Sequence, residues 1–328
     1  MRAPSGVLLA LLLALGALAE PPSDVALSTG PAAEEYFIVI DAGSSGCRVH
    51  VFSVKWTGAA DGLPTVAFPA PKKKTNPGLS SFEDTPDAAG ASLAPLMKFA
   101  FDNIPPEKHA STPVRLAATA GLRLVGNVTA TRILDSCFSF LSEKTPFLVR
   151  RNLISVISGR DEGSLGWLAI NFLSQRLRGQ VEHAKGTLGG IEMGGASSQV
   201  TVEVDQHVLS GTGGAHSSSY SLRLGDQVYK LYTHSYLGFG MEAARERYNE
   251  IVNVEEDPCL PIGFTKEDGK RAGGVGPYHG REGKVLGAGN FTKCYAAVQA
   301  LFHSAAPCSA QPCSFGGVHQ PEWWAQQQ

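Results

Sequence analysis

The chain has 328 residues, enough for two domains of ordinary size, and 43% of them are hydrophobic, as is typical of globular proteins. Lysine and arginine number 28 against 30 aspartates and glutamates, so the formal net charge is −2. A nucleic-acid-binding protein usually carries a clustered basic excess, and this balance therefore argues against a nucleic-acid partner.

The first residues have the pattern of a secretory signal peptide. Arg2 gives a positive start, residues 7–17 form an apolar run, and Ala-Leu-Ala at 17–19 fits the cleavage pattern before Glu20. We expect residues 1–19 to be this signal peptide and residues 20–35 a flexible lead. The run is short for a membrane span, with an uncleaved N-terminal anchor as the alternative. No later segment is long and apolar enough to span a bilayer, so we expect a secretory-pathway protein: Golgi-luminal, at the cell surface or secreted.

Residues 36–54 predict a strand, a tight turn and a second strand. Residues 36–40 are rich in β-branched side chains, and residues 47–54 alternate apolar and polar. Between them, DAGSSG at 41–46 has small residues that let backbone N–H groups approach an anion, with hydroxyls and a carboxylate beside them. Such a loop can hold a phosphate by its backbone and a cation by its acid, although a plain Gly/Ser hairpin turn is commoner.

The next elements are predicted from spacing and turn signals. Lys72-Lys73-Lys74 is interpreted as a solvated loop face, with a phosphate or membrane contact as the alternative. Residues 84–104 have the apolar spacing of a helix, which Pro105 ends. We also expect strands at 112–116 and 147–149 and a helix at 130–144.

Two segments here carry polar groups suited to a ligand site. Thr119 and Arg123 follow a predicted strand in ATAGLR at 118–123, where a structural turn is the alternative. Acidic residues precede a helix predicted for 163–177. Since carboxylates are favoured at helix N-termini, the pattern favours Glu162 as a cap that complements the helix dipole. The functional alternative is that Glu162 projects into a cleft as a general base.

Residues 189–204 repeat the layout of the first hairpin: a strand, the acid Glu192, Gly194-Gly195, Ser197-Ser198, and an alternating strand at 199–204. Two loops of one design predict two similar half-structures that face each other across a cleft and grip one polyphosphate. We expect lobe I at residues 36–155, with the first loop, and lobe II at residues 156–328, with Glu162 and the second loop.

The remainder is less regular. We expect a linker at 216–220, a strand at 227–232, a turn at 233–236 and a helix at 241–251. Residues 257–289 are glycine-rich and predicted to be irregular, residues 294–302 form a short helix, and residues 314–328 have no predicted element.

The cysteines agree with an oxidising compartment. Cys308 and Cys313 are close enough for a local bridge, which leaves Cys259 with Cys294, although sequence alone does not determine the connectivity. The triplets NVT at 127–129 and NFT at 290–292 are glycosylation acceptors where they are exposed. Two further cysteines are expected to be buried thiols: Cys47 and Cys137.

Taken in order, four segments resemble conserved regions of the apyrase family, the nucleoside triphosphate diphosphohydrolases. They are DAGSSGCR at 41–48, ATAGLR at 118–123, GRDEG at 159–163 with WLAIN at 167–171, and EMGGASSQ at 192–199. The resemblance covers about residues 36–321. It implies an α/β, two-lobed, actin-like (ribonuclease-H-like) fold, as the paired loops suggested independently.

The resemblance implies hydrolysis of the terminal phosphate of nucleoside tri- and diphosphates with Ca²⁺ or Mg²⁺. Glu162 would be the general base that activates water, which reverses the preference for a cap. Asp41 and Glu192 would hold the metal ion through waters. The residues that would position the phosphate or the water are Thr119, Ser44, Ser197 and Gln199. The rest of the implied phosphate- and nucleotide-binding set is Gly43, Ser45, Gly46, Cys47, Arg48, Gly194, Gly195, Ala196 and Ser198.

Three features depart from the family pattern: two residues and the end of the sequence. Glu192 stands where many members have Asp, and Met241 where some place an arginine over the nucleobase. The sequence also ends where the family continues with a fifth region, which has base-contacting aromatics, and a terminal helix. We therefore expect an incomplete second lobe that lacks the closing C-terminal helix.

Two other functions compete with a nucleoside phosphohydrolase. An exopolyphosphatase-like phosphohydrolase needs the same parts, whereas the signal peptide and the Glu162 segment with Trp167 argue against a cytosolic sugar kinase. A truncated nucleotide-binding protein without activity is the alternative from a different class.

Overall fold

The computed structural model describes residues 34–55, 64–180, 182, 185–205, 218–224, 227–252, 256–268, 283–303, 306–308 and 311–320. The predicted signal peptide lies outside these ranges, as does the lead apart from Glu34 and Glu35, which already belong to the first strand. Within the described ranges, no helix combines the length and the apolar character needed to cross a bilayer.

The N-terminal half forms a six-stranded sheet with β1 at its centre. β1 pairs with β2 antiparallel on one side and with β5 parallel on the other, and β5 pairs parallel with β6. β3 and β4 both pair with the outer edge of β2. The strands are β1 (Glu34–Gly43), β2 (Gly46–Lys55), β3 (Thr65–Val66), β4 (Lys72–Thr75), β5 (Pro113–Ala118) and β6 (Leu148–Val156).

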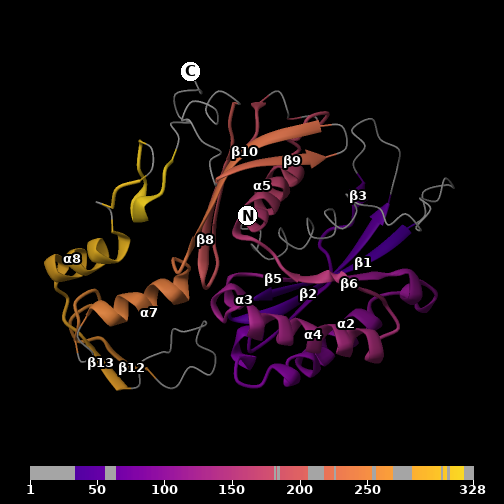
Figure 1. Ribbon diagram of the computed structural model, residues 1–328, viewed down its shortest axis with the longest axis horizontal. Helices are drawn as coiled ribbons and strands as arrows, with labels where there is room; N and C mark the ends of the chain where they lie inside the picture. Colours follow the sequence, from indigo (N-terminus) through magenta and orange to yellow (C-terminus); the bar gives the residue numbers. More distant parts are fainter. Residues whose placement is uncertain are drawn as a thin grey trace.

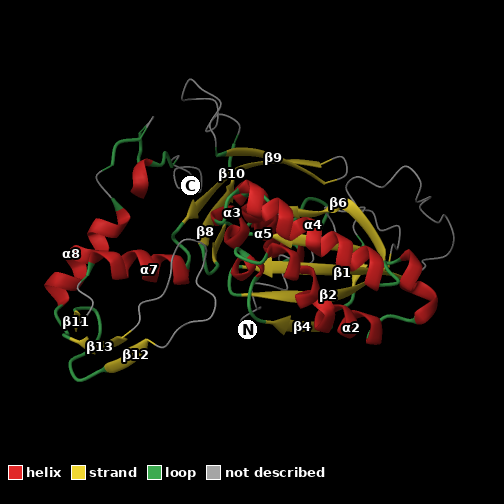
Figure 2. Cartoon of the chain, turned by 60° about the horizontal axis from the view of Figure 1, so that its bottom comes forward, coloured by secondary structure: helices red, strands yellow, loops and turns green. Residues whose placement is uncertain are grey.

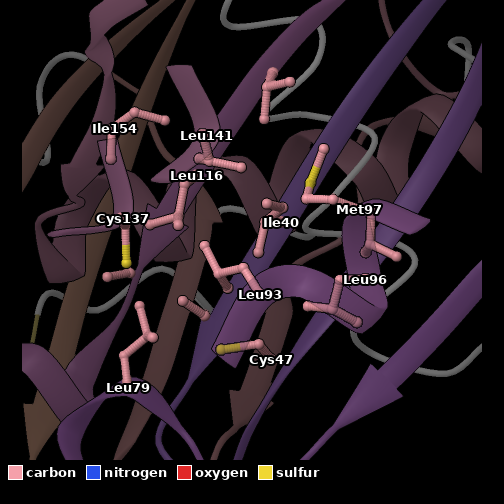
Figure 3. Close-up of a cluster of buried hydrophobic side chains, with 14 of the residues drawn as sticks. Ile40, Cys47, Leu79, Leu93, Leu96, Met97, Leu116, Cys137, Leu141 and Ile154 are labelled. Atoms are coloured by element: carbon pink, nitrogen blue, oxygen red, sulfur yellow. The ribbon is translucent and has the colours of Figure 1, made fainter. Parts of the chain in front are cut away.

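Alternate side chains of β1 enter two different cores, because successive residues of a strand point to opposite faces. Ile38 and Ile40 pack on the face covered by α2 and α4, and Figure 3 shows Ile40 there among Leu93, Met97 and Leu141. Burial of such side chains contributes about 1.5–3 kcal/mol each. The helices of this half are α2 (Ala94–Asp102), α3 (Ala120–Leu124) and α4 (Asn127–Lys144), with 3-10 turns η1 (Leu79–Phe82), η2 (Pro86–Ala88), η3 (Gly90–Leu93) and η4 (Pro106–Ser111).

The opposite face of the first sheet packs against α5 (Gly159–Leu173) and a second sheet (Figure 1). Phe37 and Val39 share a core with Trp167 of α5 and with Tyr229 and Leu231 of the second sheet. This second sheet is antiparallel, in the order β7-β8-β10-β9. Its strands are β7 (Gly190–Met193), β8 (Ser197–Glu203), β9 (Ser219–Leu224) and β10 (Gln227–Leu237).

The C-terminal elements form a small separate group at one end of the molecule (Figure 2). α7 packs on α8 around Tyr248, Ala297 and Leu301, beside a sheet in the order β11-β13-β12. The elements are α7 (Met241–Ile251), β11 (Glu256–Asp257), β12 (Thr265–Asp268), β13 (Gly283–Gly287), α8 (Phe291–Phe302) and the turn η6 (Phe315–Gly317). The predicted disulfides Cys259–Cys294 and Cys308–Cys313 are both confirmed, and Cys47 and Cys137 are buried free thiols as expected.

Several sequence-based boundaries were wrong. The helix expected at 84–104 is α2 alone, preceded by 3-10 turns, because Pro95 has no N–H to donate and is tolerated only in the first turn of an α-helix. The turn expected at 233–236 is part of β10, where pairing with β8 overrides the local polar pattern. Lys72–Thr75 is strand β4 and not a loop, and residues 257–289 contain three short strands.

Asn171 ties α5 to the segment that leads into β7. It is fully buried; its Nδ2 donates to the backbone oxygens of Trp167 and Leu188, and its Oδ1 accepts from the Leu188 N–H at 2.7 Å. We expect Asn171→Leu to lower the free energy of unfolding by about 2–4 kcal/mol, because it leaves backbone groups without partners. Urea unfolding followed by tryptophan fluorescence measures this. Asn103→Leu, at the exposed C-cap position after α2, is the control and should cost less than about 1 kcal/mol; equal losses would contradict the assigned role.

Candidate functional site

The turns of the two predicted hairpins lie against each other. Strands β1 and β2 are joined by Ser44-Ser45, and β7 and β8 by Gly194-Gly195-Ala196, where the Gly194 N–H donates to the Ser197 carbonyl at 2.9 Å. A Cβ added at Gly195 would collide with the Ser44 hydroxyl and come within 2.7 Å of the Glu242 carboxylate. A side chain at this position would therefore force these two side chains to move.

A cavity of about 630 Å³ lies between the turns and contains most of the predicted site. The predicted residues that line it are Asp41, Gly43, Ser44, Ser45, Arg48, Thr119, Glu162, Glu192, Gly194, Gly195, Ala196 and Ser197. They come from β1, β2, the end of β5, the first turn of α5 and the β7–β8 hairpin. Segments up to about 150 residues apart in sequence thus share one cavity, as two facing loops predict.

Four predicted residues do not line this cavity. Gly46 is enclosed by Lys74, Thr75 and Asn76, and Cys47 belongs to the hydrophobic core under the first sheet. The Ser198 hydroxyl donates to the Phe239 carbonyl at 2.6 Å and so is already engaged. Gln199 does not line the cavity, but its Nε2 donates a hydrogen bond to Glu162, which does.

Glu162 is held at the start of α5 by contacts from three elements. The capping role belongs to its neighbours, because Ser158 and Asp161 form a reciprocal capping box. Glu162 is 6% exposed, and its Oε2 accepts hydrogen bonds from the Arg123 guanidinium and from Gln199 Nε2, the latter at 3.1 Å. Arg123 also donates to Ser197 Oγ at 3.2 Å, so the carboxylate is fixed toward the second turn.

The electrostatics of Glu162 place its titration close to neutral pH. Burial raises the pKa of the carboxyl to about 7, while the charge and hydrogen bond of Arg123 lower it and the charge of Asp41 raises it. A carboxylic acid tuned to this range can accept a proton from water and return it at physiological pH.

The two acids of the hairpins occupy equivalent positions but have different partners. Asp41 is opposite Arg48 in the β1–β2 register and forms an ion pair with it at 3.2 Å, whereas Glu192 is opposite the uncharged Gln199. Burial raises the pKa of Asp41, and Arg48 lowers it. Burial also raises the pKa of Glu192 to about 8, and the charges of Glu162 and Asp41 add to this rise.

These acids fit a hydrated divalent cation better than a closed metal cage. In the described ranges, no group of three Asp, Glu, His or Cys side chains is placed to ligate one ion directly. Asp41, Glu162 and Glu192 nevertheless line one cavity, and the charges of Glu162 and Asp41 add to the rise that burial causes in the Glu192 pKa. Carboxylate oxygens suit Ca²⁺ and Mg²⁺, and Mg²⁺ usually keeps several of its waters, so binding through water is compatible with this spacing.

Sequence reasoning gave no role to several residues around the cavity. Arg123 was noted as a polar group after a strand in the ATAGLR segment, but its contact with Glu162 was not predicted. Ser235 accepts from Gln199 Nε2 at 3.0 Å, but its strand was interpreted as a turn. Glu242 and the lysines of β4 also line the cavity, and only the tertiary structure brings them there.

The comparisons with known proteins agree with one another. The profile of the GDA1/CD39 (nucleoside phosphatase) family matches residues 28–328. A guanosine-diphosphatase of Candida albicans is 31% identical over an alignment of 335 residues, and the alignment covers 92% of this chain and 54% of that protein. The human nucleoside diphosphate phosphatase ENTPD5 is 36% identical over 88% of this chain and 63% of its own length. The chain thus spans a little over half the length of the curated relatives it matches.

A solved structure supports the fold. The nucleoside triphosphate hydrolase of Neospora caninum superimposes with a TM-score of 0.59, at 18% identity, over 88% of this chain and 70% of that one. The mixed α/β, two-lobed, actin-like fold expected from the resemblance is therefore confirmed.

The raised pKa of Glu192 predicts how stability depends on pH when a chelator removes divalent cations. An unfolded glutamate titrates near pH 4.3, so the folded chain keeps a proton that the unfolded chain releases, and stability falls as the pH rises toward 8. Glu192→Gln removes the carboxyl group and therefore its contribution to the fall in stability at higher pH. The free energy of unfolding should therefore fall less between pH 5 and pH 8 in this variant than in the wild type. Glu250→Gln, an exposed position on α7, should follow the wild type; identical slopes for all three would refute the prediction.

Proposed function

The chain belongs to the GDA1/CD39 (nucleoside phosphatase) family, and from this premise we propose that it hydrolyses the terminal phosphate of nucleoside di- and triphosphates with a divalent cation. The observation that carries the proposal is that Glu162, tuned to titrate near neutral pH, lies in one cavity with both glycine-serine turns. A general base and two anion-binding turns are the parts that phosphoanhydride hydrolysis requires.

In the proposed mechanism, Glu162 accepts a proton from the attacking water. Arg123 and Gln199 fix the direction of its carboxylate, and the Arg123 charge keeps a fraction of it ionised at neutral pH despite burial. The hydroxyls of Ser44, Thr119 and Ser197 line the cavity and would orient the terminal phosphate or the water. Fixed orientation of this kind lowers the entropic cost of reaction.

The turns would bind the phosphates through the backbone N–H groups of Ser44, Ser45, Gly195 and Ala196, since these four turn residues line the cavity. Asp41 and Glu192 would hold Ca²⁺ or Mg²⁺ through waters, and such an ion, when bound, neutralises charge on the phosphates.

Location and domain organisation form part of the proposal. Two disulfides support passage through an oxidising compartment, and we place the protein in the secretory pathway. We divide the chain into lobe I at residues 36–155 and lobe II at residues 156–328, since the two hairpins belong to different sheets.

Glu162→Gln tests the assigned base. We expect phosphate release from nucleoside di- and triphosphates with Mg²⁺ or Ca²⁺ to fall about 10²–10⁴-fold, because the amide cannot accept the proton of water. Glu143→Gln, at an exposed position on α4, is the matched control and should retain full activity. An excess of chelator should abolish the wild-type rate. Wild-type rates in Glu162→Gln would remove the base assignment, and a folded wild type that binds nucleotides without turnover would be a binding protein instead.

Gly195→Ala tests the close approach of the second turn to Ser44. The added methyl group collides with the Ser44 hydroxyl and the Glu242 carboxylate and should displace both side chains, so we expect kcat/KM for nucleoside diphosphates to fall at least about tenfold. Gly189→Ala, on the same hairpin with ordinary contact distances around its Cβ, should change it less than about twofold. The assay measures phosphate release, with thermal unfolding as a check on folding; similar rates for both variants would show that the turns need not touch.

A further inference from the structure

Strand β4 brings three consecutive lysines to the wall of the cavity. In the β2–β4 register, Lys74 is opposite Arg48 and Lys72 is opposite His50. Directly opposed residues of antiparallel strands share a face, so Lys72, Lys74 and Arg48 form one row, named here the basic strip. Each member lines the cavity that contains Asp41 and Glu162.

The basic strip begins at the first phosphate turn and leads away from it. The Lys74 side chain lies over Gly46, where an added Cβ would come within 2.9 Å of its Cε, and Arg48 contacts Asp41. Lys72 is two residues further along the strand, about 7 Å away at strand spacing. The strip therefore continues the line of the turn donors.

The two lysines of the strip are exposed, and neither lies within ion-pair distance of a carboxylate in the part of the chain that the structure describes. Lys74 is near enough for its charge to lower the Asp41 pKa, and Lys72 lies further from the turn. His50 beneath them adds no charge at neutral pH, because burial, with Lys72 and Arg48, lowers its pKa to about 4. Two free ammonium groups beside an anion site favour a ligand with more negative charge than the turns alone bind.

The described lining of the cavity is mostly polar or charged. Apart from glycine and alanine, its apolar side chains are Met193 and Met241. Lysine and arginine side chains and hydroxyl groups are donors that bind phosphate oxygens, so this part of the cavity is suited to a chain of phosphates.

We propose that the basic strip extends the phosphate site, so that the cleft also hydrolyses inorganic polyphosphate chains, with the phosphates beyond the terminal pair bound by Lys72 and Lys74. The inference rests on the proposed function and adds a substrate class to it. Water attacks the terminal phosphorus and transfers a proton to Glu162; the phosphoanhydride P–O bond breaks, and the shortened chain leaves with the bridging oxygen and its electron pair.

Inorganic tripolyphosphate is the probe, and guanosine diphosphate is the reference substrate, both with Mg²⁺. For the wild type we expect kcat/KM for tripolyphosphate to be within about tenfold of that for the nucleotide, because Lys72 and Lys74 bind the additional phosphate of the longer chain. In the double variant Lys72→Gln/Lys74→Gln, KM for tripolyphosphate should rise about tenfold or more, and KM for guanosine diphosphate less than about threefold. Lys55→Gln/Lys144→Gln, at two exposed positions outside the cavity lining, is the charge-matched control and should change neither KM.

The dependence of the rates on ionic strength is a second measurement, and a variant that merely distorts the fold would not change it selectively for one substrate. The rate with tripolyphosphate should fall more steeply with ionic strength than the nucleotide rate, and this difference should vanish in the double variant. Turnover of nucleotide but not of tripolyphosphate would overturn the inference and leave the proposed function intact. Turnover of neither by the folded chain would overturn both. An equal rise of KM for both substrates would show that the strip does not select longer chains.

Discussion

The buried ion pair between Arg123 and Glu162 joins the parts of the cleft at one point. Arg123 comes from α3, which follows β5 of the first sheet, and Glu162 from the first turn of α5. The same guanidinium donates to Ser197 of the second hairpin. Burial raises the pKa of Glu162 and the arginine opposes that rise, so the two effects leave the carboxyl balanced near neutral pH. A carboxylate this deep without its arginine would be an uncompensated buried charge.

The hairpins share one layout and differ in charge. Asp41 and Glu192 hold equivalent positions, but Arg48 compensates the first, and the second faces Gln199. The first lobe therefore presents a neutralised acid followed by a row of cations, while the second presents an acid with no cation beside it in the register. The row of cations lies on the side of the first hairpin, where we propose that a phosphate chain binds, while both acids line the cavity in which we propose that they hold a cation through waters.

Helix α5 makes this arrangement rigid. Trp167 and Leu168 occupy a core shared by both sheets, while Asn171 satisfies the backbone of the segment before β7. Glu162 and Glu192 are thus placed by one helix and its neighbours, and their separation does not depend on flexible loops. A site on rigid elements is held more precisely than one on loops.

The sequence by itself determined the features that depend on local order along the chain: the two acid-glycine-serine turns, the strands beside them, α7 and the family resemblance. Helix grammar alone assigned Glu162 to a cap, and the resemblance assigned it to the site; the structure gives the cap to Ser158 and Asp161. Only the tertiary structure decided that Arg123 meets Glu162, that the hydroxyl of Ser198 is engaged elsewhere, and that Lys72 and Lys74 belong to the cavity wall. The physical reason is that strand pairing and burial act between residues far apart in sequence. A run of lysines has the same local pattern whether it faces solvent or a phosphate.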